Sequence, residues 1–174
     1  MEVDWHLGDT QLILNECRKE GLSDRHTAYV LATAYHETAH TMKPVREAFW
    51  LSEGWRRDNL RYYPWYGRGY AQLTWRRNYK HAGEVLGLDL TTDPDVVMRP
   101  EIAVKVLVRG MQEGWFTGVI LDKYDTFEDM RRIVNGTDKA ALIAGYAREY
   151  LAEMPKRGIN WGAILRFIMG IFKR

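Results

Sequence analysis

Apolar residues recur every three or four positions along most of this chain, which is the spacing expected of helices that bury one face. Gly, Pro and polar capping residues separate these segments. The pattern predicts helices between Asp9 and Gly21, between Ser23 and Pro44, and at about 72–87, 100–113, 127–134 and 137–154. We therefore expect a mainly α protein.

The size and composition of the chain fit a single folded domain. It has 174 residues, 46% hydrophobic and 28% charged, which is typical of globular proteins and unlike disordered ones. Its one cysteine, Cys17, rules out an internal disulfide. We expect one α domain over residues 1–154, followed by a distinct segment over 155–174.

Residues 43–70 interrupt the helical pattern. This stretch is rich in Pro, Gly, Arg and aromatic residues and shows neither the helical nor the strand period over any length. Long structured loops of this kind often carry function. The sequence predicts a long aromatic-rich loop excursion, and a short hairpin is one form that it can take.

The C-terminal segment has a charge pattern of its own. Residues 155–174 carry five basic side chains and no acidic one, whereas the remaining residues carry 20 basic and 23 acidic ones. "INWGAILRFIMGIFKR" places Arg166 and Lys173 on one helical face, and it is shorter than the roughly 20 apolar residues that span a bilayer. Residues 156–174 are expected to form an amphipathic helix that binds an anionic membrane or lipopolysaccharide. Packing of this helix on the domain stays the alternative.

Residues 36–40 read "HETAH", which matches the H-E-x-x-H zinc signature. On a helix this spacing puts the imidazoles of His36 and His40 on one face, with Glu37 placed to polarise a metal-bound water. Zinc needs a third protein ligand, and no other histidine has the extended metzincin spacing. A zinc peptidase therefore stays an alternative to an acid that works without a metal, and we predict no metal and no cofactor.

Further motifs follow in a fixed order. They are "YYPWYGRGYAQLTWRRNY" at 62–79, "DPDVVMRPEIAVKVLV" at 93–108 and "IVNG" at 133–136. Together with "HET" at 36–38, they resemble glycoside hydrolase family 19, in particular its compact lysozyme-like branch, which includes phage endolysins. The resemblance covers about residues 25–150. It implies a single lysozyme-like or chitinase-like α domain.

Glu37 and Glu47 are the predicted catalytic pair. Glycoside hydrolysis needs one carboxylic acid to protonate the leaving oxygen and a carboxylate to activate water, and in inverting enzymes the two stand roughly 6.5–9.5 Å apart. We expect Tyr35, Met42 and Phe49 to remove water from around Glu37, the acid. Glu47 would then be the base, and Glu53 is the second candidate for that role. A surface ion pair with Arg46 or Lys43 is the alternative for Glu47.

Arg68 is expected within reach of Glu47, where its positive charge would keep that carboxylate ionised. The resemblance gives Thr74 the place of a residue that helps to hold the attacking water. It gives Gln72 and Asn78 substrate-contact places and puts Asn135 on the cleft wall. Loop and cap hydrogen bonding is the alternative for these polar residues.

Aromatic rings in the same motif can stack on sugar rings, and Tyr66 and Tyr70 are predicted to bind substrate with Arg68. Plain packing is the alternative for each ring. Many family members carry an Arg two residues before the Gly-Tyr of the late helix. Here that position is Ile143, and Arg148 is the candidate substitute.

We predict an endolysin-type glycosidase that hydrolyses the β-1,4 glycan backbone of peptidoglycan with inversion. A chitinase is the alternative, and a zinc peptidase or a membrane-disrupting module are alternatives from other classes. The chain shows no nucleic-acid-binding motif, and we expect a monomer. Its N-terminus lacks the basic and apolar regions of a signal peptide. By analogy with phage enzymes, we expect synthesis in the host cytoplasm and action on the cell wall after release.

Overall fold

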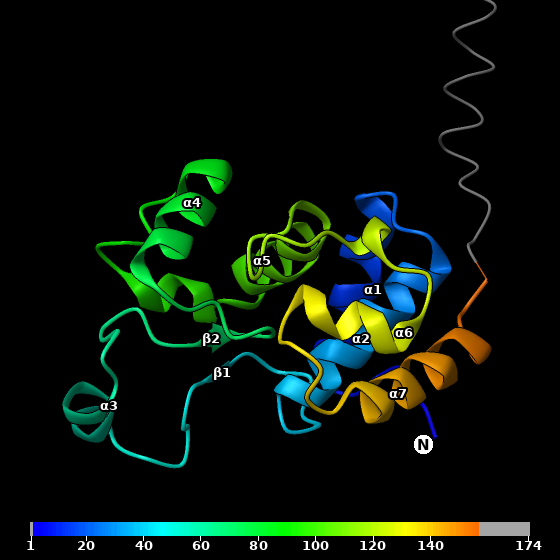
Figure 1. Ribbon diagram of the computed structural model, residues 1–174, viewed down its shortest axis with the longest axis horizontal. Coiled ribbons are helices and arrows are strands. Elements are labelled where there is room, and N and C mark those ends of the chain that lie inside the picture. The colour runs from blue at the N-terminus through cyan, green and yellow to red at the C-terminus, as the bar shows by residue number, and fades with distance from the viewer. Residues whose placement is uncertain (1, 157–174) are drawn as a thin grey trace, which may run out of the picture.

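A computed structural model describes residues 2–156 of the chain (Figure 1). Its elements, in chain order, are α1 (Thr10–Lys19), α2 (Asp24–Glu37), β1 (Val45–Arg46), α3 (Glu53–Asn59), β2 (Arg68–Gly69), α4 (Arg76–Leu86), the 3-10 turn η1 (Pro94–Met98), α5 (Pro100–Glu113), η2 (Leu121–Lys123), α6 (Phe127–Met130), η3 (Arg131–Ile133) and α7 (Ala140–Ala152). The fold is mainly α, as expected. The helix predicted over 156–174 lies outside the described residues, apart from Lys156.

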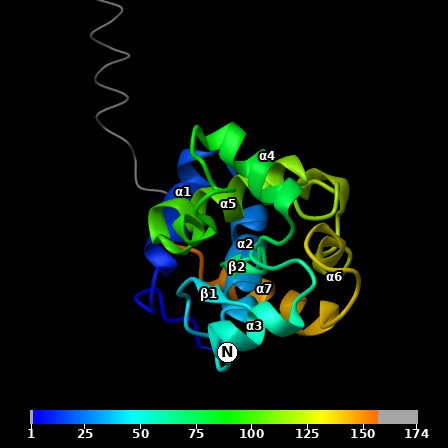
Figure 2. The same cartoon turned by 90° about the vertical axis from the view of Figure 1, so that its left-hand side faces the viewer.

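Helix α2 forms the centre of the main core. Every residue from Thr27 to Ala34 is buried, so this helix has no solvent-facing stripe over two turns. Helices α1, α5 and α7 pack around it, and α6 packs on α7. In Figure 2, α2 lies in the middle of the group of helices. The last turn of α2 is therefore held firmly from several sides.

A second, smaller core lies under α4. It consists of buried residues from α4, η1, α5 and the loops beside them: Leu73, Tyr79, Ala82, Leu90, Val97, Val106 and Trp115. Helix α5 contributes to both cores, with Leu107 and Val108 in the main one and Val106 in the smaller one. Figure 1 shows α5 between the α3–α4 side of the molecule and the side formed by α1, α2, α6 and α7.

The loop excursion contains a short antiparallel pair of strands. Val45 pairs with Gly69 and Arg46 with Arg68, but the connection between the two strands is long and contains helix α3, so the pair is not the short hairpin that the loop could have formed. Helix α3 was not predicted, because Arg56 is its only buried residue and no apolar stripe marks it. A local cap begins it instead: the Ser52 side chain accepts a hydrogen bond from the Trp55 amide.

Several predicted helix ends are correct and others shift. Ser23 and Thr126 cap α2 and α6, and Pro100 begins α5, as expected. Helices α4 and α7 begin later than predicted, because the residues before them, Trp75 and Lys139, have left-handed backbones with φ of 75° and 56°. The segment predicted as one helix over 127–134 divides into α6 and η3.

The end of α2 departs most from the expectation. The helix ends at Glu37 and does not continue toward Pro44, because Ala39, His40 and Met42 have φ values of 49°, 66° and 53°. The Thr38 hydroxyl fixes this end by donating to the Ala34 carbonyl and accepting from the Met42 amide. Within residues 2–156, no helix has the length and apolar character needed to cross a bilayer.

Candidate active site

Glu37, the last residue of α2, forms an ion pair with Arg131 of η3. The Arg131 Nη1 atom donates to Glu37 Oε1 at 2.7 Å, and its Nε donates to the Asp138 carbonyl at 2.8 Å. The Arg131 side chain is 2% exposed and that of Glu37 is 18% exposed. The carboxyl group therefore sits at the protein surface in a fixed orientation.

This environment differs from the apolar one that we expected around Glu37. Phe49 is 53% exposed, and the Tyr35 ring stacks on the His40 ring with centroids 4.3 Å apart. Arg148 was the candidate substitute for the arginine that many family members carry at the position of Ile143. It pairs with Glu128 on the surface and not with Glu37. Sequence reasoning missed Arg131, whose only signal is its place two residues before the "IVNG" motif.

The H-E-x-x-H geometry is not formed. Because the helix ends at Glu37, His36 and His40 do not share a helical face. His40 packs against Tyr35 and Tyr146, and burial lowers the pKa of His36. Among residues 2–156, no group of three or more His, Cys, Asp or Glu side chains has the arrangement of a metal site.

Glu47 follows strand β1, and both of its carboxylate oxygens accept hydrogen bonds. Oε1 accepts from the Tyr62 hydroxyl at 2.6 Å, and Oε2 accepts from the Gly67 amide at 2.9 Å. Burial, and then the bond to Glu47, raises the pKa of Tyr62 to about 12. Arg46 does not pair with Glu47, because its guanidinium contacts Asp95 at 3.0 Å.

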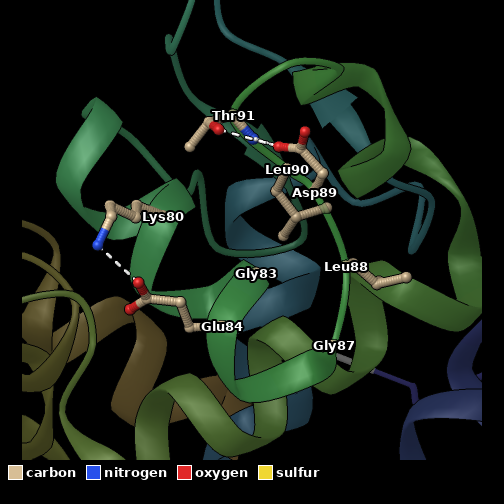
Figure 3. Close-up of a pocket in the computed structure, with 8 residues that line it drawn as sticks. All are labelled: Lys80, Gly83, Glu84, Gly87, Leu88, Asp89, Leu90 and Thr91. Atoms are coloured by element: carbon tan, nitrogen blue, oxygen red, sulfur yellow. Dashed lines mark hydrogen bonds and ion pairs between the residues drawn. The ribbon is translucent and has the colours of Figure 1, made fainter.

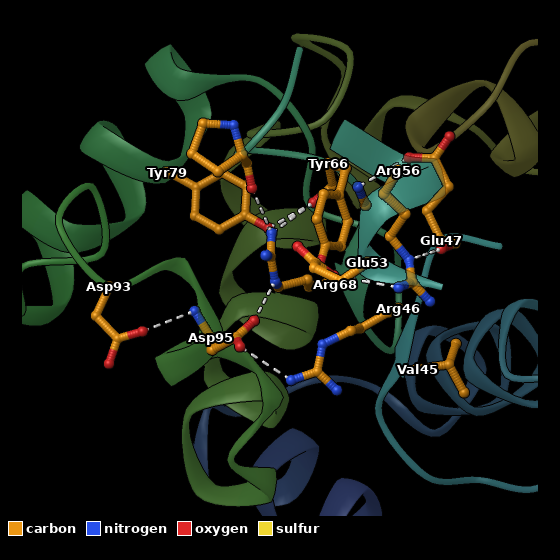
Figure 4. A network of polar contacts seen from close by, with 12 residues as sticks. Val45, Arg46, Glu47, Glu53, Arg56, Tyr66, Arg68, Tyr79, Asp93 and Asp95 are labelled. Carbon is orange, nitrogen blue, oxygen red and sulfur yellow. Dashed lines mark hydrogen bonds and ion pairs between the residues drawn. The ribbon is translucent and has the colours of Figure 1, made fainter. Parts of the chain in front are cut away.

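The main chain at Glu47 is held by Arg56 of α3 (Figure 4). Arg56 is 5% exposed, and it donates to the carbonyls of Glu47 at 2.8 Å and Ala48 at 3.1 Å. Its Nη1 also donates to Glu53 at 3.2 Å. Ala48 has a φ of 49°, which a residue other than glycine rarely adopts. Arg56 therefore fixes a strained turn that carries Glu47.

Arg68, Tyr66 and Tyr70 lie in the interior. The buried Arg68 guanidinium stacks 3.6 Å from the Tyr66 ring centroid and donates to Asp95 at 2.7 Å (Figure 4). Tyr66 and Tyr70 are no more than 1% exposed. Their hydroxyls already donate to Glu53 and Asp9. We therefore do not retain these three residues as substrate contacts, and Arg68 does not pair with Glu47.

Gln72, Thr74 and Asn78 line one pocket of about 240 Å³, together with Tyr62, Ala71, Trp75, Phe116 and Val134. The Thr74 hydroxyl donates to the Gln72 carbonyl at 2.8 Å. The Asn78 amide donates to the Thr74 carbonyl at 2.9 Å, and the Gln72 amide donates to the Val45 carbonyl at 3.2 Å. Predicted polar residues from one motif thus converge on one cavity.

Glu47 is one contact away from this pocket, and Glu37 is linked to it through Arg131 and the main chain of Val134. Tyr62, which donates to Glu47, lines it, and so does Val134, three residues after Arg131. A Cβ at Gly67 would lie 2.6 Å from Gln72 Oε1 and 3.3 Å from Glu47 Oε2, so glycine is needed there for both side chains to approach. Asn135 is exposed and does not line the pocket. Its main-chain amide donates to the Arg131 carbonyl.

A second pocket, of about 400 Å³, lies at the end of α4 and is not connected with these residues (Figure 3). It forms where the chain turns back after Gly87. Hydrogen bonds from Thr92, and then from Thr91, lower the pKa of Asp89 in this turn to about 2. We assign no function to this pocket.

Comparison with known proteins decides the family. Residues 25–112, half of the chain, match the glycoside hydrolase family 19 model, which is described as chitinase class I. The chain belongs to glycoside hydrolase family 19. The matched region contains Glu37, Glu47 and the whole "YYPWYGRGYAQLTWRRNY" motif. The endolysin branch within family 19 stays a prediction.

Similar proteins include an acidic endochitinase from Dioscorea japonica, 31% identical over 144 residues, which are 75% of this chain and 57% of the relative. Endochitinase At2g43620 from Arabidopsis thaliana is 36% identical over 110 residues, 58% of this chain and 36% of the relative. The chain thus spans about a third to just over half the length of these relatives. Chitinase C from Streptomyces griseus HUT6037 superposes with a TM-score of 0.59 at 21% identity, covering 84% of this chain and 69% of that structure. This likeness confirms the fold.

Proposed function

We propose that this protein is a chitinase-type glycoside hydrolase that cleaves β-1,4-linked chains of 2-acetamido sugars. The observation that carries the proposal is the placement of two oriented carboxyl groups near a pocket lined by Gln72, Thr74 and Asn78. Glu47 contacts Tyr62, which lines this pocket, and Glu37 pairs with Arg131, whose main-chain carbonyl accepts from the amide of the lining residue Val134. Amide and hydroxyl groups of this kind hydrogen-bond sugar hydroxyls and acetamido groups.

In the proposed mechanism Glu37 donates a proton to the glycosidic oxygen and Glu47 removes one from the attacking water. The Thr74 hydroxyl uses its hydrogen to bond the Gln72 carbonyl, so its oxygen lone pairs face outward as acceptors for that water. Water attacks from the side opposite the leaving oxygen, and the anomeric configuration inverts in a single step.

The partners of the two carboxyl groups hold each of them in a fixed direction. Arg131 sets the direction of the Glu37 carboxyl, while Tyr62 and the Gly67 amide set that of Glu47. Side chains that are already held lose little freedom when the substrate arrives, which lowers the entropic cost of reaching the reactive geometry. Arg131 and Tyr62 are thus positioning residues.

The names of the relatives make chitin the first substrate to test, in place of the peptidoglycan that the sequence led us to expect. Peptidoglycan is the second candidate, since its backbone has the same linkage and acetamido group. The five basic residues of 155–174 favour it, because the bacterial envelope is anionic. We retain as a proposal that residues 156–174 bind such a surface.

Digesting chitin hexamer and purified peptidoglycan side by side tests these proposals, with the anomer of the new reducing end read by NMR. Glu37→Gln and Glu47→Gln should each lower kcat about 100-fold or more, the usual size of a general acid or base contribution. Glu84→Gln is the control, because Glu84 pairs with Lys80 on the surface of α4. Wild-type rates in Glu37→Gln, or retention of the anomeric configuration, would refute the mechanism.

A further inference from the structure

The segment that carries α3, β2 and the start of α4 is strongly basic. Residues 53–80 include seven Lys or Arg and two Asp or Glu, although the whole chain has a net charge of only +2. Four of the seven have acidic partners: Arg56 with Glu53, Arg57 with Asp58, Arg68 with Asp95, and Lys80 with Glu84. Among the described residues, the other three form no ion pair: Arg61, Arg76 and Arg77.

These three arginines lie near Trp75 at the edge of the active-site pocket, and the Arg76 guanidinium also lies 5.4 Å from the Trp65 ring centroid. The Arg61 guanidinium lies 5.1 Å from the Trp75 ring centroid, and a neighbouring pocket of about 450 Å³ is lined by Trp75, Arg76 and Arg77. Trp75 also lines the pocket of Gln72, Thr74 and Asn78, so the two cavities adjoin at this ring. The Trp75 side chain is 40% exposed and is available to a ligand.

Three exposed cations close together repel one another, and among the described residues no acidic side chain lies within ion-pair distance of them. This arrangement is favourable when an anion binds. Arginine presents a planar fork of donors that matches a carboxylate in two parallel hydrogen bonds, and the indole ring beside it fits the flat face of a sugar. A neutral glycan would use the ring and leave the guanidinium groups unpaired.

We propose that Arg61, Arg76 and Arg77 form a specificity-determining rim that selects a glycan with carboxylate groups on its sugar rings over a neutral one. This inference rests on the proposed function, which gives the substrate as a β-1,4-linked glycan. It adds that the preferred glycan is negatively charged. The rim attracts the substrate over about a Debye length, roughly 8 Å at physiological ionic strength, so the selection weakens as salt rises.

The test compares three soluble substrates: peptidoglycan glycan strands freed of their peptides, so that the carboxylates on the sugar rings are exposed, the same strands with every carboxylate converted to a methylamide, and chitin hexamer. At low salt the wild type should cleave the carboxylate strands with a kcat/KM about tenfold above that for the amide strands, the size expected of three exposed charge pairs acting together. The triple variant R61Q/R76Q/R77Q should lose this preference and change the rate on chitin hexamer less than twofold.

Lys123→Gln is the control for loss of positive charge elsewhere on the surface, because it removes an exposed charge in η2 without changing the rim, and each single rim variant is compared with it. Affinity for the carboxylate and amide strands is measured in parallel by calorimetry with the Glu37→Gln variant. Equal rates and affinities on the two kinds of strand, or an undiminished preference in the triple variant, overturn the proposal. Absence of cleavage with a retained binding preference would instead refute the proposed function and leave the rim supported.

Discussion

Replacement of Arg131 by Met tests whether the ion pair with Glu37 holds the site together. The change removes the donors to the Glu37 carboxyl and the Asp138 carbonyl, both within 2.8 Å of the guanidinium. Loss of one partner of a buried ion pair costs about 3–5 kcal/mol. Glu37 is 18% exposed and regains some water, so we expect the lower end, about 3 kcal/mol.

A loss of about 3 kcal/mol should lower Tm by roughly 6–12 °C in a domain of this size. Urea unfolding followed by tryptophan fluorescence gives the free energy of unfolding directly. The control is Arg132→Met at the next residue, which is 51% exposed and lies 3.9 Å from Asp129, with an expected change under about 0.5 kcal/mol. Because Arg131 positions Glu37, Arg131→Met should also lower kcat more than it raises KM.

A double-mutant cycle supplies the decisive comparison. Replacing both partners, as in R131M/E37L, leaves no buried charge without a partner, so the double variant should be about 1–2 kcal/mol more stable than the sum of the single changes. If the two single changes add within about 0.5 kcal/mol, the contact between Arg131 and Glu37 is not what stabilises this region, and the reasoning is refuted.

Three further predictions concern other parts of the molecule. Arg56→Ala should lower kcat on chitin oligomers at least about tenfold, because the main chain at Glu47 loses the donors that hold it. Gly83→Ala should destabilise the fold by about 1–3 kcal/mol in urea unfolding, because its Cβ would lie 2.5 Å from a backbone carbonyl. Hydrogen bonds lower the pKa of Asp89 from its ordinary value of 3.8 to about 2 in the folded state. The ionised side chain therefore stabilises the folded state fully above pH 3.8, and this contribution is lost as pH falls through about 2. The urea concentration at half-unfolding should therefore fall less steeply with decreasing pH between pH 3.8 and about 2 in Asp89→Asn than in the wild type.

Each of these three has an outcome that would contradict it. Arg57→Ala is the control for Arg56, since Arg57 is exposed, and an equal fall in kcat in both variants would exclude a specific role of Arg56. Gly145→Ala should raise stability by up to about 1 kcal/mol, because nothing lies within 4 Å of the new Cβ in α7. A similar gain in stability in Gly83→Ala would count against the packing described for Gly83. An unchanged fall of the urea midpoint at low pH in Asp89→Asn would count against the hydrogen bonds described for Asp89.

Much of the fold was predictable because its signals are local. Ser23 and Thr126 mark helix starts through hydrogen bonds within three residues and Pro100 through its fixed φ, and apolar periodicity marks the faces that α1 and α5 bury. Helix α3 escaped prediction because a cap and one buried arginine make it, with no apolar stripe. The convergence of Gln72, Thr74 and Asn78 was also predictable, since all three belong to one motif.

The sequence by itself determined the mainly α class, most of the helix starts, the resemblance to the family, and the two candidate carboxylates. Only the tertiary structure decided that Arg131, 94 residues along the chain, pairs with Glu37, and that Arg68, Tyr66 and Tyr70 lie inside. The reason is physical: caps and periodicity act between residues a few positions apart, whereas ion pairs and burial depend on which distant elements pack together. A sequence motif therefore identifies which side chains are candidates, but the packing around each side chain decides whether it lies at the substrate site or in the core.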